Sequence, residues 1–322
     1  MKISIVMYHY VRDVADTRWA RMNVRTRAEF RAQLDHIGER YTVVGMDQVF
    51  DAVMHGTPLP KNPLLLTFDD GLREHHQFVL PELQWRGWRA AFFPVVAAAR
   101  ERLPLAPHMT HAILASANAR LLAEEIRARV EVEAPRLHIA DVAGWCQRLS
   151  QPTRFDTAET VFVKRALQTA LPAEMRQRLL GEFFAAHVRL PLMSWANELY
   201  MTEAELRELV AAGMYVGGHT LTHPWLSACT PAQQQREIDQ TRRFLIELGA
   251  IRSDGRWAMA YPYGAYDAVT LRLAAAERVA VGLTTRVAPA DISRDARLTL
   301  PRLDTNDLPC AVGSATESLV AP

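Results

Sequence analysis

The chain has 322 residues, enough for one large α/β domain or for two ordinary domains with a substantial buried core. Hydrophobic residues make up 49% and charged residues 23% of the chain, as in globular proteins, and the formal net charge at pH 7 is +1. This near neutrality argues against nucleic acid or an anionic membrane surface as the main partner.

Cysteine usage and the N-terminal segment indicate the cellular setting. Cys146, Cys229 and Cys310 lack the spacing of a metal-binding pair, so we expect small core residues rather than a disulfide framework or a cysteine-ligated zinc site. The N-terminus has no long apolar stretch with a small-residue cleavage site, and no segment is apolar for long enough to span a membrane. We therefore expect a cytoplasmic protein without membrane insertion.

Strands and helices alternate in the first hundred or so residues. Apolar strands are predicted at residues 3–7, 64–68 and 90–95, with helices over residues 26–34 and from about residue 74. Such alternation predicts parallel pairing in an α/β fold. In such folds the working residues lie at the carboxyl ends of the strands.

The middle of the chain has a different pattern. Residues 121–126 and 161–167 have helical periodicity, and strand-like alternation is scarce between residues 97 and 199. We interpret residues 97–199 as a helical insertion, either a subdomain or a lid, between two parts of the α/β domain at residues 1–96 and 200–322.

Alternation resumes after residue 200. Helices are predicted from Thr202 to about Gly213 and from Thr230 to Gly249, and strands at residues 214–218, 258–261 and 279–283.

Two adjacent carboxylates, Asp69 and Asp70, follow the apolar strand at residues 64–68. Because ionised neighbours repel, folds tend to keep such a pair where a cation or a shared proton relieves the repulsion. Successive side chains leaving a strand point in different directions, so one carboxylate can bind a metal ion while the other takes a proton from water. The alternative is a solvent-exposed Asp-Asp-Gly turn.

Two histidines, His219 and His223, follow the predicted strand at residues 214–218. Two imidazoles four residues apart can bind one ion, and imidazole suits zinc and its first-row neighbours. With one aspartate they leave coordination positions open for water and substrate, as a catalytic site requires. Unrelated loop histidines are the alternative, which the shared position at predicted strand ends disfavours.

Four further histidines are weaker candidates. We expect His75 and His76 to be exposed on the helix after Gly71, whereas His108 and His111, at the start of the insertion, can face the active-site cleft.

The motifs at residues 67–71 (TFDDG), 219–223 (HTLTH) and 261–264 (YPYG) resemble those of the polysaccharide deacetylases, the NodB-homology proteins of carbohydrate esterase family four. Residues 87–93 also resemble the second strand of that family. The resemblance covers residues 1–96 and 200–322 and leaves the helical insertion outside.

The resemblance implies a distorted (β/α) barrel and a divalent metal ion, usually zinc, bound by Asp70, His219 and His223. It makes Asp69 the base that activates water, with the backbone N–H of Tyr263 stabilising the oxyanion. Without the other motifs, the Pro-Tyr-Gly segment would be interpreted as a simple turn.

The sequence departs from the family pattern in two places. The arginine that usually supports the catalytic aspartate is replaced by Ala260, and Arg302 can supply the charge from another strand end, unless it is a surface arginine. No histidine follows His223 to act as the general acid. His9, just after the first strand, resembles members with late motifs circularly permuted to the N-terminus; it would protonate the leaving amine, unless it is a core histidine.

The sequence therefore predicts a metal-dependent hydrolase that removes an N-acyl group, most often acetyl, from an amino sugar. A soluble sugar, nucleotide sugar or glycan precursor is favoured as the substrate, since no export signal is evident. Two alternatives remain: a cyclic amide hydrolase of the same fold, and a glycan-binding module with a decayed site. The oligomeric state, the sugar, the acyl group and the metal stay open.

Overall fold

The computed structural model describes residues 1–153 and 156–310. The chain separates into two compact units. The first contains Met1–Asp13, Val24–Leu103 and the chain from Ala196 onward, and the second contains Val14–Asn23 and Pro104–Trp195.

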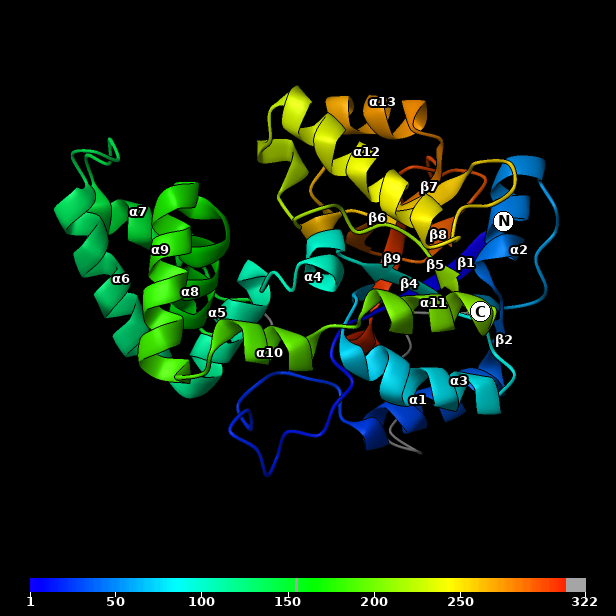
Figure 1. Cartoon of the computed structure of the whole chain (residues 1–322), viewed down its shortest axis with the longest axis horizontal. Coiled ribbons are helices and arrows are strands. Elements are labelled where there is room, and N and C mark those ends of the chain that lie inside the picture. Colours follow the sequence, from blue (N-terminus) through cyan, green and yellow to red (C-terminus); the bar gives the residue numbers. More distant parts are fainter. Residues whose placement is uncertain (154–155, 311–322) are drawn as a thin grey trace. The chain divides into compact units, whose positions relative to one another are not determined.

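The first unit holds the strands (Figure 1). They are β1 (Lys2–Tyr8), β2 (Thr42–Val43), β3 (Pro63–Asp70), β4 (Ala91–Pro94), β5 (Tyr215–Val216), β6 (Trp257–Ala260), β7 (Val279–Val287), β8 (Ala290–Asp291) and β9 (Leu300–Asp304). Its helices are α1 (Arg27–Arg40), α2 (Met46–His55), α3 (Leu80–Trp85), α4 (Val96–Arg100), α11 (Glu203–Ala211), α12 (Pro231–Glu247) and α13 (Ala268–Ala276). A π-helical turn, His75–Val79, precedes α3, and short 3-10 turns cover Leu226–Ala228, Pro262–Gly264 and Thr305–Asp307.

The sheet is parallel along its main path and closes on itself. The strands lie in the order β5-β4-β3-β1-β9-β7-β6, with β2 beside β3 and the short antiparallel β8 beside β1. A parallel bridge between Gly218, just after β5, and Met259 of β6 joins the two ends of this path. In Figure 1, α12 and α13 lie on one side of the strands and α1, α3 and α11 on the other. The predicted distorted (β/α) barrel is confirmed.

The two faces of β3 bury different side chains. Leu64, Leu66 and Phe68 belong to a core cluster that includes residues of the surrounding helices, whereas Leu65 belongs to a second cluster with Ile5, Phe93 and Ala260 from neighbouring strands. Because side chains alternate along a strand, Thr67 and Asp69 lie on the same face as Leu65. This face is the interior of the barrel, so Asp69 is at the end of an interior column.

Three of the helices begin where the sequence predicts. Thr26 with Glu29, Thr202 with Glu205, and Thr230 with Gln233 form capping boxes at the starts of α1, α11 and α12. The strand predicted at residues 214–218 is shorter, because β5 covers Tyr215–Val216 and the following glycines form single bridging contacts.

The second unit is helical. It contains α5 (Ala106–Ser116), α6 (Ala119–Glu133), α7 (Val142–Leu149), α8 (Ala158–Arg165) and α9 (Ala173–Phe183), with π-helical turns at Ala166–Ala170 and Phe184–Val188; α10 (Leu192–Leu199) crosses the boundary between the units. The structure adds Val14–Asn23 to this unit. Its action as a lid stays a prediction.

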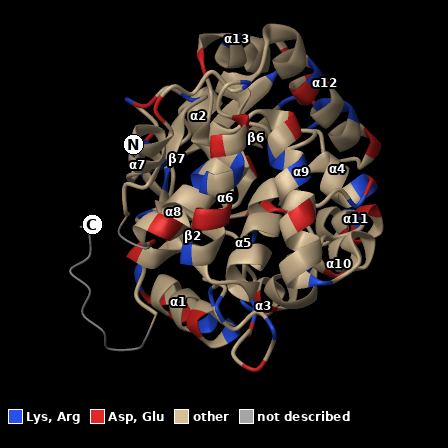
Figure 2. Cartoon of the chain, turned by 90° about the vertical axis from the view of Figure 1, so that its left-hand side faces the viewer, with Lys and Arg blue, Asp and Glu red and all other residues tan. Residues whose placement is uncertain are grey.

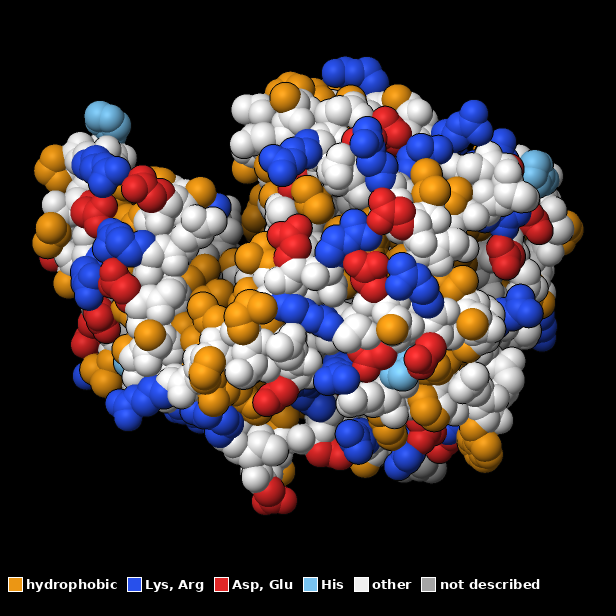
Figure 3. All heavy atoms as spheres, in the orientation of Figure 1, with side chains coloured by type: hydrophobic (Ala, Val, Ile, Leu, Met, Phe, Trp, Pro, Cys, Tyr) orange, Lys and Arg blue, Asp and Glu red, His pale blue; other side chains and the backbone are white. Residues whose placement is uncertain are grey.

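Charge on the surface, helix hydropathy and cysteine burial can each be compared with the expectations from the sequence. Basic and acidic residues alternate along the ribbon in Figure 2, and their side chains are interspersed over the face drawn in Figure 3. Among the described residues, no helix is both long and apolar enough to cross a membrane. Cys146 is buried as predicted, whereas the core position predicted for Cys229 and Cys310 is wrong, since both are half-buried.

The barrel closes tightly around Gly217, which leads to a prediction about this residue. A Cβ atom there would lie 2.5 Å from the Phe93 ring and 2.7 Å from the Ala258 carbonyl oxygen. Gly217→Ala should therefore lower the free energy of unfolding by about 1–3 kcal/mol through overpacking, measured by urea denaturation. The matched control is Gly181→Ala in α9, where the new Cβ meets open space. This change should be neutral or stabilising by up to about 1 kcal/mol. Equal losses in both variants would contradict the account.

Candidate metal centre and active site

The candidate site residues gather at the carboxyl ends of the barrel strands. Asp70 is the last residue of β3, His9 follows β1, and His219 lies three residues after β5. The parallel register pairs Tyr8 with Phe68, so the chain places His9 beside Asp69. These positions match the strand-end location that the alternation of strands and helices predicts.

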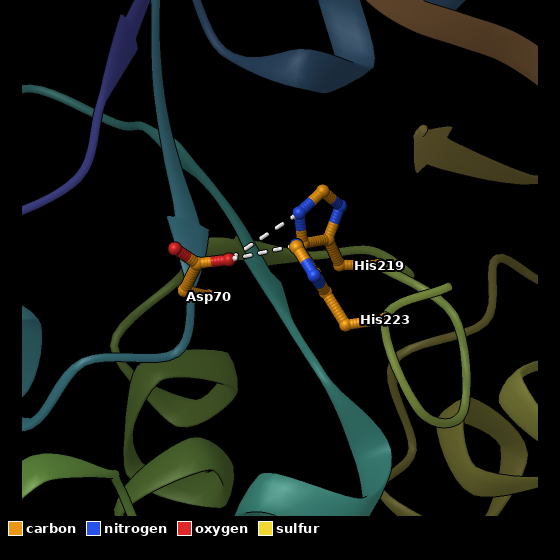
Figure 4. A group of neighbouring side chains, drawn as sticks. All are labelled: Asp70, His219 and His223. Carbon is orange, nitrogen blue, oxygen red and sulfur yellow. Dashed lines mark ion pairs between the residues drawn. The ribbon is translucent and has the colours of Figure 1, made fainter. Parts of the chain in front are cut away.

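Asp70, His219 and His223 form one buried cluster (Figure 4). Asp70 Oδ1 is 3.4 Å from Nε2 of each histidine, and both rings point toward it. Two ligands at about 2.0–2.1 Å from a tetrahedral zinc ion stand about 3.3–3.4 Å apart, so the spacing and the donor set fit a divalent cation.

The protein fixes the orientation of His219. Its Nδ1 is 2.7 Å from the carbonyl oxygen of Ala260. A carbonyl can only accept, so Nδ1 carries the proton and Nε2 presents its lone pair toward Asp70. This is the usual support of a metal-binding histidine.

The loop between the histidines is held from α12. The backbone N–H and the hydroxyl of Thr222 donate to the Glu237 carboxylate at 2.9 and 2.7 Å, and the backbone N–H of His223 donates to the Thr220 hydroxyl at 3.0 Å. No sequence motif singles out Glu237, because its role depends on where α12 packs.

The electrostatics also favour a positive charge at the cluster. Burial alone would lower the pKa of His219, but Asp69 and Asp70 reverse this effect and leave the pKa raised. The carboxylates therefore stabilise positive charge in a buried place, which is what a cation site requires.

Four residues at the site have strained backbone. Left-handed φ angles occur at Asp70 (70°), Thr220 (67°), His223 (63°) and Tyr263 (58°). Such conformations cost about 1–3 kcal/mol each for residues other than glycine, and they persist where the surrounding structure determines them. Here they turn side chains at the strand ends toward a common point.

Asp69 forms a bidentate ion pair with Arg302 inside the barrel. Nη1 and Nη2 of Arg302 donate to the two carboxylate oxygens at 2.9 and 2.7 Å, and Nε donates to the Thr284 carbonyl at 2.9 Å. Both residues are 1% exposed, so the surface-arginine alternative is wrong. Ala260, which stands where the family usually has its arginine, belongs to the core cluster of the barrel interior.

This ion pair sets the protonation state of Asp69. Burial raises the pKa of the carboxyl, but the charge and hydrogen bonds of Arg302, helped by the nearby His219 and His9, leave it below its ordinary value. Asp69 is therefore ionised at neutral pH and can accept a proton.

His9 lies next to Asp69 with an accessible side chain. Its Nε2 is 4.0 Å from Oδ2 of Asp69, and the side chain is 42% exposed, so the core-histidine alternative is wrong. The ring can meet a ligand from solvent while staying beside the ionised carboxylate.

Tyr263 packs against the cluster of Asp70, His219 and His223. Its ring stacks on Trp225 with centroids 4.6 Å apart and meets the ring of His223 edge-on at 4.8 Å. Trp225 was not among the sequence candidates, although it follows the second histidine closely.

The remaining histidines have different surroundings. The exposed position predicted for His75 is wrong, because it is fully buried and its Nε2 lies 2.7 Å from the His9 carbonyl oxygen. His76 is half-buried and pairs with Glu208 at 2.6 Å. His108 and His111 lie on α5 of the helical unit, and their approach to the cleft stays a prediction.

Part of the chain is similar in sequence to polysaccharide deacetylases. The family model described as polysaccharide deacetylase matches residues 179–281, which include the histidine motif and Tyr263. Poly-beta-1,6-N-acetyl-D-glucosamine N-deacetylase of Escherichia coli (strain K12) is 39% identical over 92 residues, 28% of this chain and 13% of that protein. The putative polysaccharide deacetylase YxkH of Bacillus subtilis (strain 168) is 29% identical over 102 residues, 32% of this chain and 35% of that protein. Residues 179–281 of this chain are therefore similar to the polysaccharide deacetylase family.

Solved structures of deacetylases share the fold. The Streptococcus pyogenes deacetylase PplD has a TM-score of 0.58 at 18% identity, with 94% of this chain and 92% of that chain covered. The BpsB deacetylase domain from Bordetella bronchiseptica has a TM-score of 0.55 at 16% identity, with 94% and 95% covered. The alignments with the two curated relatives, in contrast, span about an eighth and a third of their lengths.

The buried ion pair makes a prediction about stability and pH. Arg302→Met leaves Asp69 buried without a counter-charge, so the free energy of unfolding at neutral pH should fall by about 3–5 kcal/mol. Wild-type Asp69 has a lowered pKa and stabilises the fold above the unfolded pKa, whereas in the variant burial raises the pKa and destabilises the ionised form. The difference in the free energy of unfolding between the wild type and the variant should therefore increase from about pH 4 to pH 7.

The measurement is urea denaturation across this pH range with a chelator present. Arg286→Met is the control, because the pair of Arg286 with Asp295 is more exposed and should contribute less than about 1 kcal/mol. A difference in the free energy of unfolding that does not change with pH would contradict this explanation.

The cation cluster makes a prediction about metal binding. Protein dialysed against a chelator should bind one zinc ion, and His223→Ala should weaken binding by more than about 100-fold, as measured by titration calorimetry. The control is His55→Ala, which changes an exposed histidine at the end of α2 and should leave binding unaltered. Equal binding by the two variants would remove His223 from the metal site.

Proposed function

We propose that this protein is a metal-dependent hydrolase that removes an N-acetyl group from an amino sugar of a glycan, a glycan precursor or a nucleotide sugar. The observation that carries the proposal is the ionised, arginine-supported Asp69 beside the cluster of Asp70, His219 and His223. The arrangement supports the proposal, because a carboxylate able to accept a proton lies near three side chains of the kinds that zinc prefers as ligands.

The reaction requires a water molecule, a polarised amide carbonyl and a protonated leaving nitrogen. Asp70, His219 and His223 would hold a divalent cation, most suitably Zn²⁺, which when bound would polarise the carbonyl and acidify water. Asp69 takes one proton from the attacking water, and its bidentate contact with Arg302 fixes the carboxylate for this transfer. The products are acetate and a free amine.

The leaving nitrogen needs a proton when the C–N bond breaks. His9 supplies it in this proposal, since its side chain is accessible and lies beside the base. The backbone N–H of Tyr263 is proposed to stabilise the oxyanion, with Trp225 supporting its position through the ring stack.

The name of a relative suggests which substrates to test first. The name of the Escherichia coli relative specifies poly-beta-1,6-N-acetyl-D-glucosamine, which makes β-1,6-linked N-acetylglucosamine oligomers the first substrates to test. The cytoplasmic location predicted from the sequence would favour soluble precursors, and it stays a prediction.

The proposal predicts a separation of metal binding from turnover. Asp69→Asn should bind zinc like the wild type but release acetate at least about 100-fold more slowly, because the amide cannot accept the proton. The assay measures acetate release from a panel of N-acetylated sugars, nucleotide sugars and oligosaccharides, with Asp239→Asn as a control on the half-exposed surface of α12.

The same panel separates the alternatives. Hydrolysis of cyclic amides without any acetate release would favour the cyclic amide hydrolase. Sugar binding without metal or product would favour the glycan-binding module. Unchanged turnover of Asp69→Asn would contradict its role as the base.

A further inference from the structure

Two partly buried contacts join the segment after β1 to the segment after β3. The first links His75 to His9, whose Nε2 and backbone carbonyl oxygen are 2.7 Å apart. A carbonyl has no proton to give, so Nε2–H of His75 is the donor. The contact therefore holds the backbone of His9 rather than its imidazole.

The second contact is an ion pair between Arg12 and Glu74. Nε of Arg12 donates to Oε1 of Glu74 at 2.7 Å, and Nη2 donates to Oε2 in a second, parallel contact. Glu74 is 6% exposed, and the guanidinium also lies 5.1 Å from the ring of Tyr10. A bidentate pair in a largely buried place fixes geometry strongly, because moving either partner would leave a buried charge without compensation.

His75 is itself held rigidly. It begins the π-helical turn His75–Val79, and its ring packs edge-on against Phe68 at 5.3 Å and tilted against Phe92 at 6.1 Å. Burial lowers the pKa of its imidazole, which keeps the ring neutral at neutral pH. Single π-helical turns often occur at functional sites.

His9 depends on its backbone for its position. It is the first residue after β1. Its exposed imidazole forms an ion pair with Asp69, in which Nε2 and Oδ2 are 4.0 Å apart. A small displacement of this segment would move the imidazole away from the base. Misplacing a catalytic group by about 1 Å can cost about 100-fold in rate.

We propose that His75 is a positioning residue for His9: its Nε2–H holds the carbonyl of His9, while the Arg12–Glu74 pair fastens the same two segments. This inference rests on the proposed function, in which His9 protonates the leaving amine. His75 would touch neither the substrate nor the metal ion.

The test is a double-mutant cycle on the zinc-loaded full chain. His9→Ala should lower kcat by about 100-fold, and His75→Leu by about 10-fold with little change in KM. Because His75 acts through His9, the double variant should be no slower than His9→Ala alone. His75→Gln keeps a side-chain N–H donor and should recover most of the rate lost in His75→Leu.

The outcomes distinguish this inference from the proposed function. A double variant in which the two losses multiply would overturn the positioning role, as would a His75→Gln variant as slow as His75→Leu. Unchanged kcat in His9→Ala would remove the acid role on which the inference rests, and no product from the wild type would count against the proposed function itself.

A second measurement needs no substrate. Nitrogen-15 NMR of histidine-labelled wild-type protein should show His75 neutral and protonated at Nε2. A ring protonated at Nδ1, or at both nitrogens, would overturn the proposed contact. Loss of that N–H signal in His75→Leu assigns it.

Discussion

The bidentate ion pair between Asp69 and Arg302 is the interaction on which the site depends. A carboxylate inside the barrel would take up a proton to avoid the cost of burial, and a protonated Asp69 could not act as a base. Arg302 compensates the charge at 2.7 and 2.9 Å while its Nε is anchored on the carbonyl of Thr284. The pair therefore gives two adjacent aspartates different environments, with Asp69 held by a guanidinium and Asp70 turned toward two histidines.

The order of the strands brings these groups together. β1 lies between β3 and β9, so the residue after β1 reaches the same edge as the carboxylates of β3. Arg302 of β9 crosses the interior to pair with Asp69. The bridge between Gly218 and Met259 closes the other side of the barrel immediately before His219. Segments that are far apart in the sequence thus meet because parallel strands end at a common edge.

Much of this arrangement could be predicted from the sequence. The carboxylate pair after an apolar run, the histidines four residues apart and the capping boxes are local patterns with direct physical meaning. Arg302 could be proposed only as one of two readings, because nothing local shows that a guanidinium from β9 fills the interior beside Ala260. Glu237 of α12 contacts Thr222, Trp225 stacks on the ring of Tyr263, and His75 contacts the carbonyl of His9. These are tertiary contacts, which no spacing rule finds.

The central claim is that Asp69 activates water and does not attack the acyl group itself. A single turnover of an N-acetylglucosamine oligomer in oxygen-18 water by the zinc-loaded protein tests this claim directly. The account predicts acetate and free amine in equal amounts, with one oxygen-18 atom in the acetate of the first turnover. Unlabelled acetate in the first turnover would contradict the account, because its new oxygen would then have come from a carboxylate of the protein.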